Sequence, residues 1–295
     1  MDFSKIGHNI RELRKKMNIS QADLADGICT QAQISKIENG CVYPLSTTLY
    51  MIANKLGVDI NYFFDICETP RLDYVTDVIE LIRDYLRNRE YEKVYNIVKA
   101  ERNNPLFQTV RNKQFLLWNE GICVFRIHQD KEKALMLMKK ALSLTLNSVY
   151  SIREMEIINS IGNVYTSTSE YHKAIPYYNQ VIEQYKALPV KKNVEIINRV
   201  YYNYARCLTF TGKLEDSVYY CDQGIKNCVY YESMHTLGEL FYQKGVNLQQ
   251  LEQIDAAISY LQKATYIFDL QHNMKYVEEV ELEIAALLSG KEDTN

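Results

Sequence analysis

The sequence contains little proline and little glycine, and this scarcity limits the fold class. Its 295 residues include 5 Pro and 11 Gly, whereas all-β and loop-rich proteins need both residue types at frequent turns. Hydrophobic residues make up 47% of the chain and charged residues 24%, which is ordinary for a globular protein. The composition therefore predicts an all-α protein, and the length is sufficient for two domains.

Long apolar segments are also missing. No run of about 18 apolar residues is present to span a bilayer, and residues 1–5 lack the apolar stretch of a signal peptide. We therefore expect a cytoplasmic protein with no membrane partner.

The patterns of metal sites and catalytic sites are absent as well. The seven cysteines are odd in number and include no Cys-x-x-Cys pair, so reduced thiols are expected. The five histidines are scattered, and no glycine-rich phosphate-binding loop occurs. The sequence predicts no catalytic residue, no metal and no cofactor, and the chain is not expected to be an enzyme.

Two short helices joined by a tight turn are predicted over residues 20–40. Ser20 and Thr30 occupy N-cap positions, and each precedes apolar residues at helical spacing. Gly27 and Gly40 are suited to ending the two helices, because glycine adopts a positive φ without strain. This layout is typical of a helix-turn-helix that reads DNA.

Polar side chains remain on the outside of the second helix once Ile34 and Ile37 are turned inward. Glutamine pairs with the N6/N7 edge of adenine, and lysine donates to guanine O6 and N7. Base contacts are therefore assigned to Gln31, Gln33 and Lys36, and a phosphate contact to Gln21 at the start of the preceding helix. The full set of predicted DNA-binding residues is Gln21, Gln31, Gln33, Ser35, Lys36 and Asn39.

Residues 3–65 resemble the Cro/repressor type of helix-turn-helix, a five-helix domain. The resemblance rests on the two helices above and on apolar patterns that fit a first, a fourth and a fifth helix at residues 6–13, 49–56 and 60–64. It implies a buried ion pair between Arg14 and Glu38. Residues 1–65 contain seven Lys or Arg and seven Asp or Glu, so nonspecific DNA affinity should be weak and specificity should depend on two linked copies.

The helical pattern breaks at residues 67–70, where a polar cluster and Pro70 separate segments of different character. Residues 1–66 are assigned to the helix-turn-helix domain and 67–88 to a linker that contains a helix over 73–87. Residues 89–290 are assigned to a repeat domain and 291–295 to a tail.

Small residues recur at fixed spacing in the second part of the chain. One set is Gly121, Gly162, Ala205 and Gly245, at steps of 41, 43 and 40, and a second set is Ala134, Ala174, Ser217 and Ala257, at steps of 40, 43 and 40. Two registers with matching steps predict helical hairpins that approach closely at the small residues and stack into a solenoid. The pattern resembles a right-handed tetratricopeptide superhelix of about five hairpins, with units longer than the usual length of about 34 residues.

Such an array presents a concave surface that binds partners. Several asparagines lie beside the small residues, although asparagine is a poor helix former. Each amide can hold both the N–H and the C=O of an extended peptide, or it can satisfy a neighbouring helix. Together, Asn159, Asn163 and Asn203 favour contact with a ligand.

A Cro-type head, a linker helix and long tetratricopeptide repeats together resemble the Rap/Npr/Plc/Prg family of peptide-responsive quorum-sensing regulators, and most closely its PlcR-like branch. The motifs that carry the resemblance are residues 37–44 (IENGCVYP), 159–165 (NSIGNVY), 202–205 (YNYA) and 241–245 (FYQKG). The resemblance implies a transcriptional regulator that binds palindromic double-stranded DNA as a homodimer. It also implies a short signalling peptide that binds the repeats and controls DNA binding.

The same resemblance suggests which residues contact the peptide. Asn159 and Asn203 would hold its backbone, and Asn163, Gln243 and Tyr276 are secondary candidates. Arg89 is the candidate for the peptide carboxylate, but Glu90 and Glu92 stand beside it where further cations are expected. The charge of the ligand therefore stays open.

Two alternatives also fit the sequence. In the first, the helix-turn-helix regulator responds to redox state, for example through Cys221 or Cys228, to a small molecule or to a protein partner. In the second, the chain is an adaptor that binds a protein through its repeats and has little DNA affinity.

Overall fold

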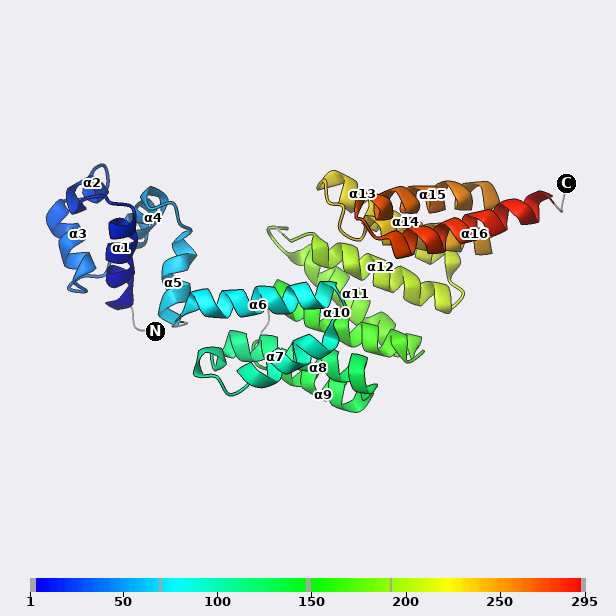
Figure 1. The fold of residues 1–295 in the computed structure, drawn as a ribbon, viewed down its shortest axis with the longest axis horizontal. Helices are drawn as coiled ribbons and strands as arrows, with labels where there is room; N and C mark the ends of the chain where they lie inside the picture. Colours follow the sequence, from blue (N-terminus) through cyan, green and yellow to red (C-terminus); the bar gives the residue numbers. More distant parts are fainter. Residues whose placement is uncertain (1–3, 69–70, 147–149, 192, 293–295) are drawn as a thin grey trace. The chain divides into compact units, whose positions relative to one another are not determined.

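The computed structural model describes residues 4–68, 71–146, 150–191 and 193–292. These residues form the helices α1–α16 and one short 3-10 helix, and no strand occurs among them (Figure 1). The all-α prediction is confirmed. None of the helices in this part of the chain has the length and apolar character needed to cross a bilayer.

The chain divides into two compact units, residues 1–116 and 117–295. The first unit contains α1 (Ser4–Lys16), α2 (Gln21–Ala25), α3 (Gln31–Glu38), α4 (Ser46–Lys55), α5 (Ile60–Glu68), α6 (Leu72–Arg87), α7 (Tyr91–Glu101), the 3-10 helix (Pro105–Phe107) and the start of α8 (Val110–His128). The second contains the rest of α8, α9 (Lys131–Ser143), α10 (Ile152–Ser167), α11 (Tyr171–Ala187), α12 (Glu195–Phe210), α13 (Leu214–Tyr230), α14 (Leu237–Gln250), α15 (Ile254–Leu270) and α16 (Met274–Glu292).

The helices α2 and α3 are capped as predicted. The hydroxyl groups of Ser20 and Thr30 accept hydrogen bonds from the backbone N–H groups of Asp23 and Gln33, at 3.1 and 3.2 Å. Gly27 and Gly40 follow the two helices with φ of 74° and 71°. The five helices of the head enclose one core, which includes Ile6, Ile10, Leu24, Ile34, Ile37, Leu49, Ile52 and Phe63.

The helix α5 continues to Glu68, past the predicted end of the head at residue 66. Cys67 is 5% exposed and packs in the head core, because it lies one turn after Phe63 on the buried face of α5. The predicted linker helix is present as α6, which buries Val75, Val78 and Ile82 and packs against α7. Thr69 and Pro70 lie outside the described residues, and the proposed domain limits stay predictions.

The small residues of the repeat pattern lie where two helices of a hairpin approach each other. A Cβ atom added to Gly121 would lie 3.1 Å from the carbonyl oxygen of Ala134, and one added to Gly245 would lie 3.3 Å from that of Ala257. Ser217 Oγ donates to the carbonyl of Ala205 at 2.7 Å. The two registers found in the sequence are therefore the two sides of the same close approach. The hairpins α8/α9, α10/α11, α12/α13 and α14/α15 follow one another, and α16 comes last.

Replacing Gly162 with alanine is expected to destabilise the array. The new Cβ would lie 2.8 Å from Cε1 of Tyr178, and this ring is fully buried and cannot move away freely. Overpacking of this kind costs about 1–3 kcal/mol, which thermal unfolding monitored by circular dichroism will detect. An unchanged unfolding midpoint would contradict the close approach of α10 and α11 at Gly162.

Candidate DNA-binding and ligand-binding surfaces

A buried ion pair joins α1 to α3, the second helix of the helix-turn-helix. Arg14 of α1 donates to both carboxylate oxygens of Glu38 at the end of α3, at 2.6 and 3.0 Å, and its third contact is the carbonyl of Ile19 at 2.8 Å. The Glu38 side chain is 1% exposed. The pair that the Cro-type resemblance implied is therefore present.

Glu38 has a lowered pKa. Its burial acts to raise the pKa, but the hydrogen bonds from Arg14 and Gln21 outweigh this effect. Arg14 in turn has a raised pKa, chiefly because of its hydrogen bond to Glu38. Both groups therefore carry their charges near neutral pH, and their interaction joins α1 to α3.

The outer face of α3 carries the side chains that were assigned to base contacts. Gln31 and Lys36 are exposed and Gln33 is half-buried, whereas Ile34 and Ile37 are buried in the head core. Within the described residues, these three polar side chains make no hydrogen bond or ion pair with the rest of the chain. Amide and ammonium groups therefore project from one helix face with their hydrogen-bonding capacity unused.

The other predicted DNA contacts have different surroundings. Ser35 is half-buried and Asn39 is exposed at the end of α3. Gln21 Nε2 donates to Glu38 Oε2 at 2.8 Å, which uses one of its two N–H bonds. The other N–H of Gln21 and the backbone N–H groups at the start of α2 remain for a phosphate.

In the second unit, the first helices of successive hairpins are joined by polar contacts between side chains about one repeat apart. Trp118 Nε1 of α8 donates to Ser160 Oγ of α10 at 3.0 Å, and Arg199 of α12 donates to Glu156 of α10 at 2.7 Å. These contacts were not foreseen, although the repeat step of 43 residues leads directly from Glu156 to Arg199.

Asn159 and Asn203 form a pair across α10 and α12. Asn203 Nδ2 donates to Asn159 Oδ1 at 3.1 Å. Asn159 is 6% exposed and Asn203 is half-buried. The pair leaves both N–H bonds of Asn159 and the carbonyl oxygen of Asn203 available. Hydrogen-bond donors therefore remain on α10 and an acceptor remains on α12. The structure thus brings together the two asparagines that the sequence ranked first.

The secondary candidates for peptide contact, Asn163, Gln243 and Tyr276, each interact with another residue of the repeats. Asn163 Oδ1 accepts from the hydroxyl of Tyr178 at 2.8 Å. Gln243 is 5% exposed, and its Nε2 donates to Thr209 Oγ1 at 2.9 Å. Tyr276 stacks on Phe268 with ring centroids 5.1 Å apart.

Arg89 belongs to the first unit and is exposed between α6 and α7 with φ of 58°. It is not part of the unit that contains the other five candidates.

The cysteines give little support to control by oxidation. All seven carry free thiols, and five are buried. Burial raises the pKa of Cys221, and it raises that of Cys228 to about 11. A buried thiol with a raised pKa holds little of the reactive thiolate.

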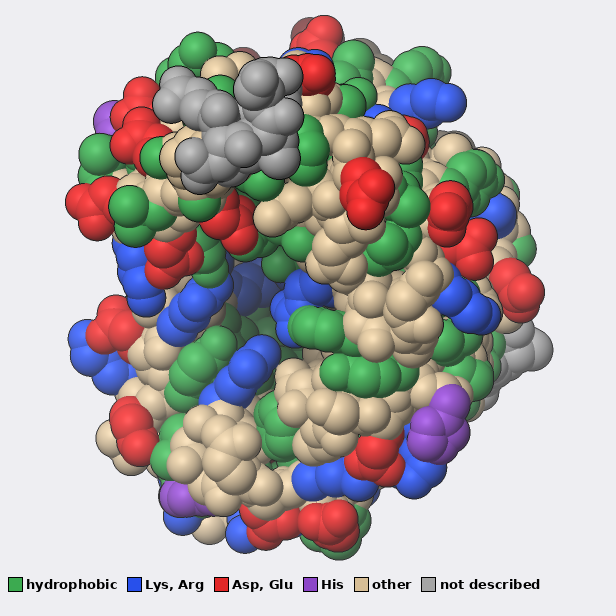
Figure 2. Space-filling model, turned by 90° about the vertical axis from the view of Figure 1, so that its right-hand side faces the viewer, with side chains coloured by type: hydrophobic (Ala, Val, Ile, Leu, Met, Phe, Trp, Pro, Cys, Tyr) green, Lys and Arg blue, Asp and Glu red, His purple; other side chains and the backbone are tan. Residues whose placement is uncertain are grey.

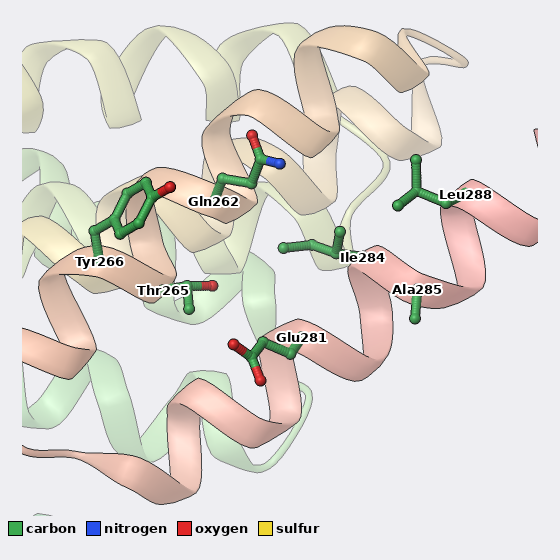
Figure 3. A pocket seen from close by; sticks show the side chains of 7 residues that line it. All are labelled: Gln262, Thr265, Tyr266, Glu281, Ile284, Ala285 and Leu288. Carbon is green, nitrogen blue, oxygen red and sulfur yellow. The ribbon is translucent and has the colours of Figure 1, made fainter.

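A hollow lies between the last two helices, α15 and α16. It has a volume of about 290 Å³ and is lined by Gln262, Thr265, Tyr266, Glu281, Ile284, Ala285 and Leu288 (Figure 3). Its α16 side includes Glu281, which is exposed. Among the described residues, no group of histidine, cysteine and carboxylate side chains is arranged to hold a metal ion.

Comparison with known families identifies the family of this chain. Residues 80–284, more than half of the chain, match the RNPP family C-terminal domain. The chain belongs to the RNPP family. Residues 10–63 of this RNPP protein also match a helix-turn-helix family, which covers the region of α1–α5. No curated protein matches the chain.

Solved structures agree with this RNPP assignment. Bacillus thuringiensis PlcR in complex with the peptide PapR7 and DNA is 27% identical, with a TM-score of 0.86 over 94% of this chain and 99% of the other. The apo form of the same PlcR is 26% identical, with a TM-score of 0.69 over 95% and 99%. Streptococcus thermophilus ComR, solved with DNA and its signalling peptide ComS, is 15% identical, with a TM-score of 0.63 over 96% and 99%, and it supports the fold alone.

Proposed function

We propose that this protein is a cytoplasmic, sequence-specific transcriptional regulator whose repeats bind a short signalling peptide that controls DNA binding. Membership of the RNPP family and the likeness to PlcR, solved with both a peptide and DNA, support this function. The proposed protein binds partners and is not an enzyme. It acts as a homodimer on a palindromic operator, with one head on each half-site.

The observation that carries the peptide proposal is the asparagine pair on α10 and α12. An extended peptide exposes alternating C=O and N–H groups. The free N–H bonds of Asn159 and the free carbonyl of Asn203 match this alternation, and their mutual hydrogen bond holds both amides in place. A site that is already ordered loses less conformational entropy when the peptide binds.

The DNA proposal rests on α3. In the proposed complex, Gln31, Gln33 and Lys36 read base edges in the major groove. Gln21, Ser35 and Asn39 contact phosphates and adjacent backbone, which positions the head without reading sequence. The neutral head makes nonspecific attraction weak, so a dimer is needed for tight binding.

The peptide would control DNA binding by favouring one curvature of the repeats. The contacts between first helices, such as Arg199 with Glu156 and Asn203 with Asn159, lie where a bound peptide bridges adjacent hairpins. A change in their spacing would alter the separation of the two heads in a dimer. The coupling between peptide and DNA can be no larger than the preference of the peptide for one state.

Replacing Asn203 with alanine is expected to weaken peptide binding about 10–100-fold, because hydrogen bonds to the peptide backbone are lost. DNA binding by the peptide-free protein should not change. Fluorescence anisotropy of a labelled peptide, selected on the wild-type protein from a synthetic heptapeptide library, measures the effect.

Asn227→Ala is the matched control. Asn227 donates to Asn198 at 2.5 Å between α13 and α12, so this variant also breaks an asparagine pair, but the substituted residue lies on α13, the second helix of its hairpin. It should retain peptide affinity. Native affinity in Asn203→Ala would contradict the assignment of the peptide site.

A further inference from the structure

Tyrosines and carboxylates gather on the first helices at the C-terminal end of the array. Tyr242 of α14 donates to Glu283 Oε1 of α16 at 3.2 Å. The helices α12 and α14 contact each other. Tyr202 of α12 and Glu279 of α16 add to the effect of burial in raising the pKa of Tyr242. Burial also raises the pKa of Tyr202, where Arg206 acts to lower it and Glu239 of α14 acts to raise it. Side chains from three successive first helices therefore converge on one region, which we call the acidic end of the groove.

The carboxylate of Glu283 has only part of its hydrogen bonding satisfied in this region. Its Oε1 accepts from Tyr242, but its Oε2 is buried and has no hydrogen-bond partner among the described residues. A carboxylate oxygen that is shielded from water without a partner is costly. Burial raises the pKa of Glu283, and the nearby Glu279 acts in the same direction, while the Tyr242 hydrogen bond opposes both. A positive charge placed here would relieve this cost.

The surrounding cations do not supply that charge. Lys275 is 82% exposed and lies 3.9 Å from Glu279, and the Arg206 guanidinium lies 6.0 Å from the ring centroid of Tyr202. No ion pair reaches Glu283 from any described residue. The ring of Tyr242 adds to the attraction, because a ring face attracts cations.

The charges along the first helices also change sign. Arg199 and Arg206 lie on α12, whereas Glu279 and Glu283 lie on α16. On the face shown in Figure 2, Lys and Arg side chains line a hollow, and Asp and Glu side chains lie on the rim above it. A ligand with charges of both signs, such as a short free peptide, would be oriented by this arrangement.

We infer that the acidic end of the groove binds a positively charged group of the peptide, and that Glu283 determines this preference. The group is either the free amino terminus or a Lys or Arg side chain. This inference rests on the proposed function, and it adds the charge of the ligand and the direction in which the peptide lies, with its cationic group toward α16.

Selection from two synthetic heptapeptide libraries tests the inference. One library has free amino termini and the other is N-acetylated. Each is passed over the immobilised full-length protein, and the retained peptides are identified by mass spectrometry. We expect either the library with free amino termini to be retained about tenfold more than the acetylated one, or peptides with Lys or Arg to be enriched about tenfold over the other peptides within each library. Enrichment that survives acetylation identifies the side chain as the source, and enrichment lost on acetylation identifies the amino terminus.

The variant Glu283→Gln should reduce the enrichment to nearly that of the input library. It is close to isosteric, and thermal unfolding checks that it folds. Glu281→Gln is the matched control, because it removes the same charge from the same helix at the separate hollow between α15 and α16. Retained peptides without excess positive charge, or unchanged enrichment in Glu283→Gln, would overturn the inference alone. Retention of no peptide by the wild-type protein would overturn the proposed function as well.

Discussion

Replacing Glu38 with alanine is expected to lower the free energy of unfolding of the head by about 3–5 kcal/mol. The substitution leaves Arg14 charged and mostly buried without its partner, and removing one member of a buried ion pair has a cost of this size. Gln21 loses the same acceptor. Because small domains are stable by only about 5–15 kcal/mol, much of the head's stability should disappear, and DNA binding with it.

Hydrogen exchange of head peptides in the full-length protein measures this effect without interference from the repeats. Faster exchange should be confined to α1–α5. The control is Glu12→Ala, which removes an exposed carboxylate that lies 3.9 Å from Lys15 and should change stability by less than about 1 kcal/mol. Equal effects of the two substitutions would contradict a structural role for the buried pair.

The same pair gives the head an acid sensitivity. The folded-state pKa of Glu38 is lowered, so its contribution is present above the unfolded pKa of about 4.3. That contribution is lost as the pH falls through the folded-state value. Head stability should therefore decrease on acidification more in the wild-type protein than in Glu38→Ala.

The double substitution Gln33→Ala/Lys36→Ala is expected to abolish sequence-selective DNA binding. Each bidentate base contact provides about 1–3 kcal/mol of discrimination, and separate contacts are roughly additive. The combined loss of about 2–6 kcal/mol corresponds to roughly 30-fold or more in affinity for the operator. Affinity for unrelated DNA should change much less.

Competition between operator and random duplexes in an electrophoretic shift assay measures this loss. The control Lys139→Ala/Lys140→Ala removes two exposed lysines from α9 and should leave selectivity unchanged. If the control lost as much selectivity as the double variant in α3, binding would depend on overall charge and α3 would not be the reading helix.

Local signals in the sequence were sufficient to predict the head. Ser20, Thr30, Gly27 and Gly40 each act within a few residues of their own position, so their roles follow from N-cap chemistry and backbone freedom. The end of α5 was not predicted; the helix continues to Glu68, and Cys67 extends its buried face.

The repeat pattern predicted which helices approach each other, because a small residue at a crossing is visible in sequence at a fixed step. It did not predict the hydrogen-bond partners of the polar side chains in the repeats. Gln243 and Asn163 bond to Thr209 and Tyr178, and those partners are set by packing between helices far apart in the chain. Asn159 and Asn203, which the family resemblance indicated, are spaced by nearly one repeat and hydrogen-bond to each other, and their contact with a peptide stays a prediction.

The central claim is that a peptide bound to the repeats controls which DNA the heads occupy. Genome-wide selection of DNA fragments by the purified protein, with and without a small-peptide extract of the producing cells, tests it most directly. The account predicts a palindromic site whose occupancy depends on the extract. A site that is occupied equally in both conditions, or no enriched site at all, would contradict it.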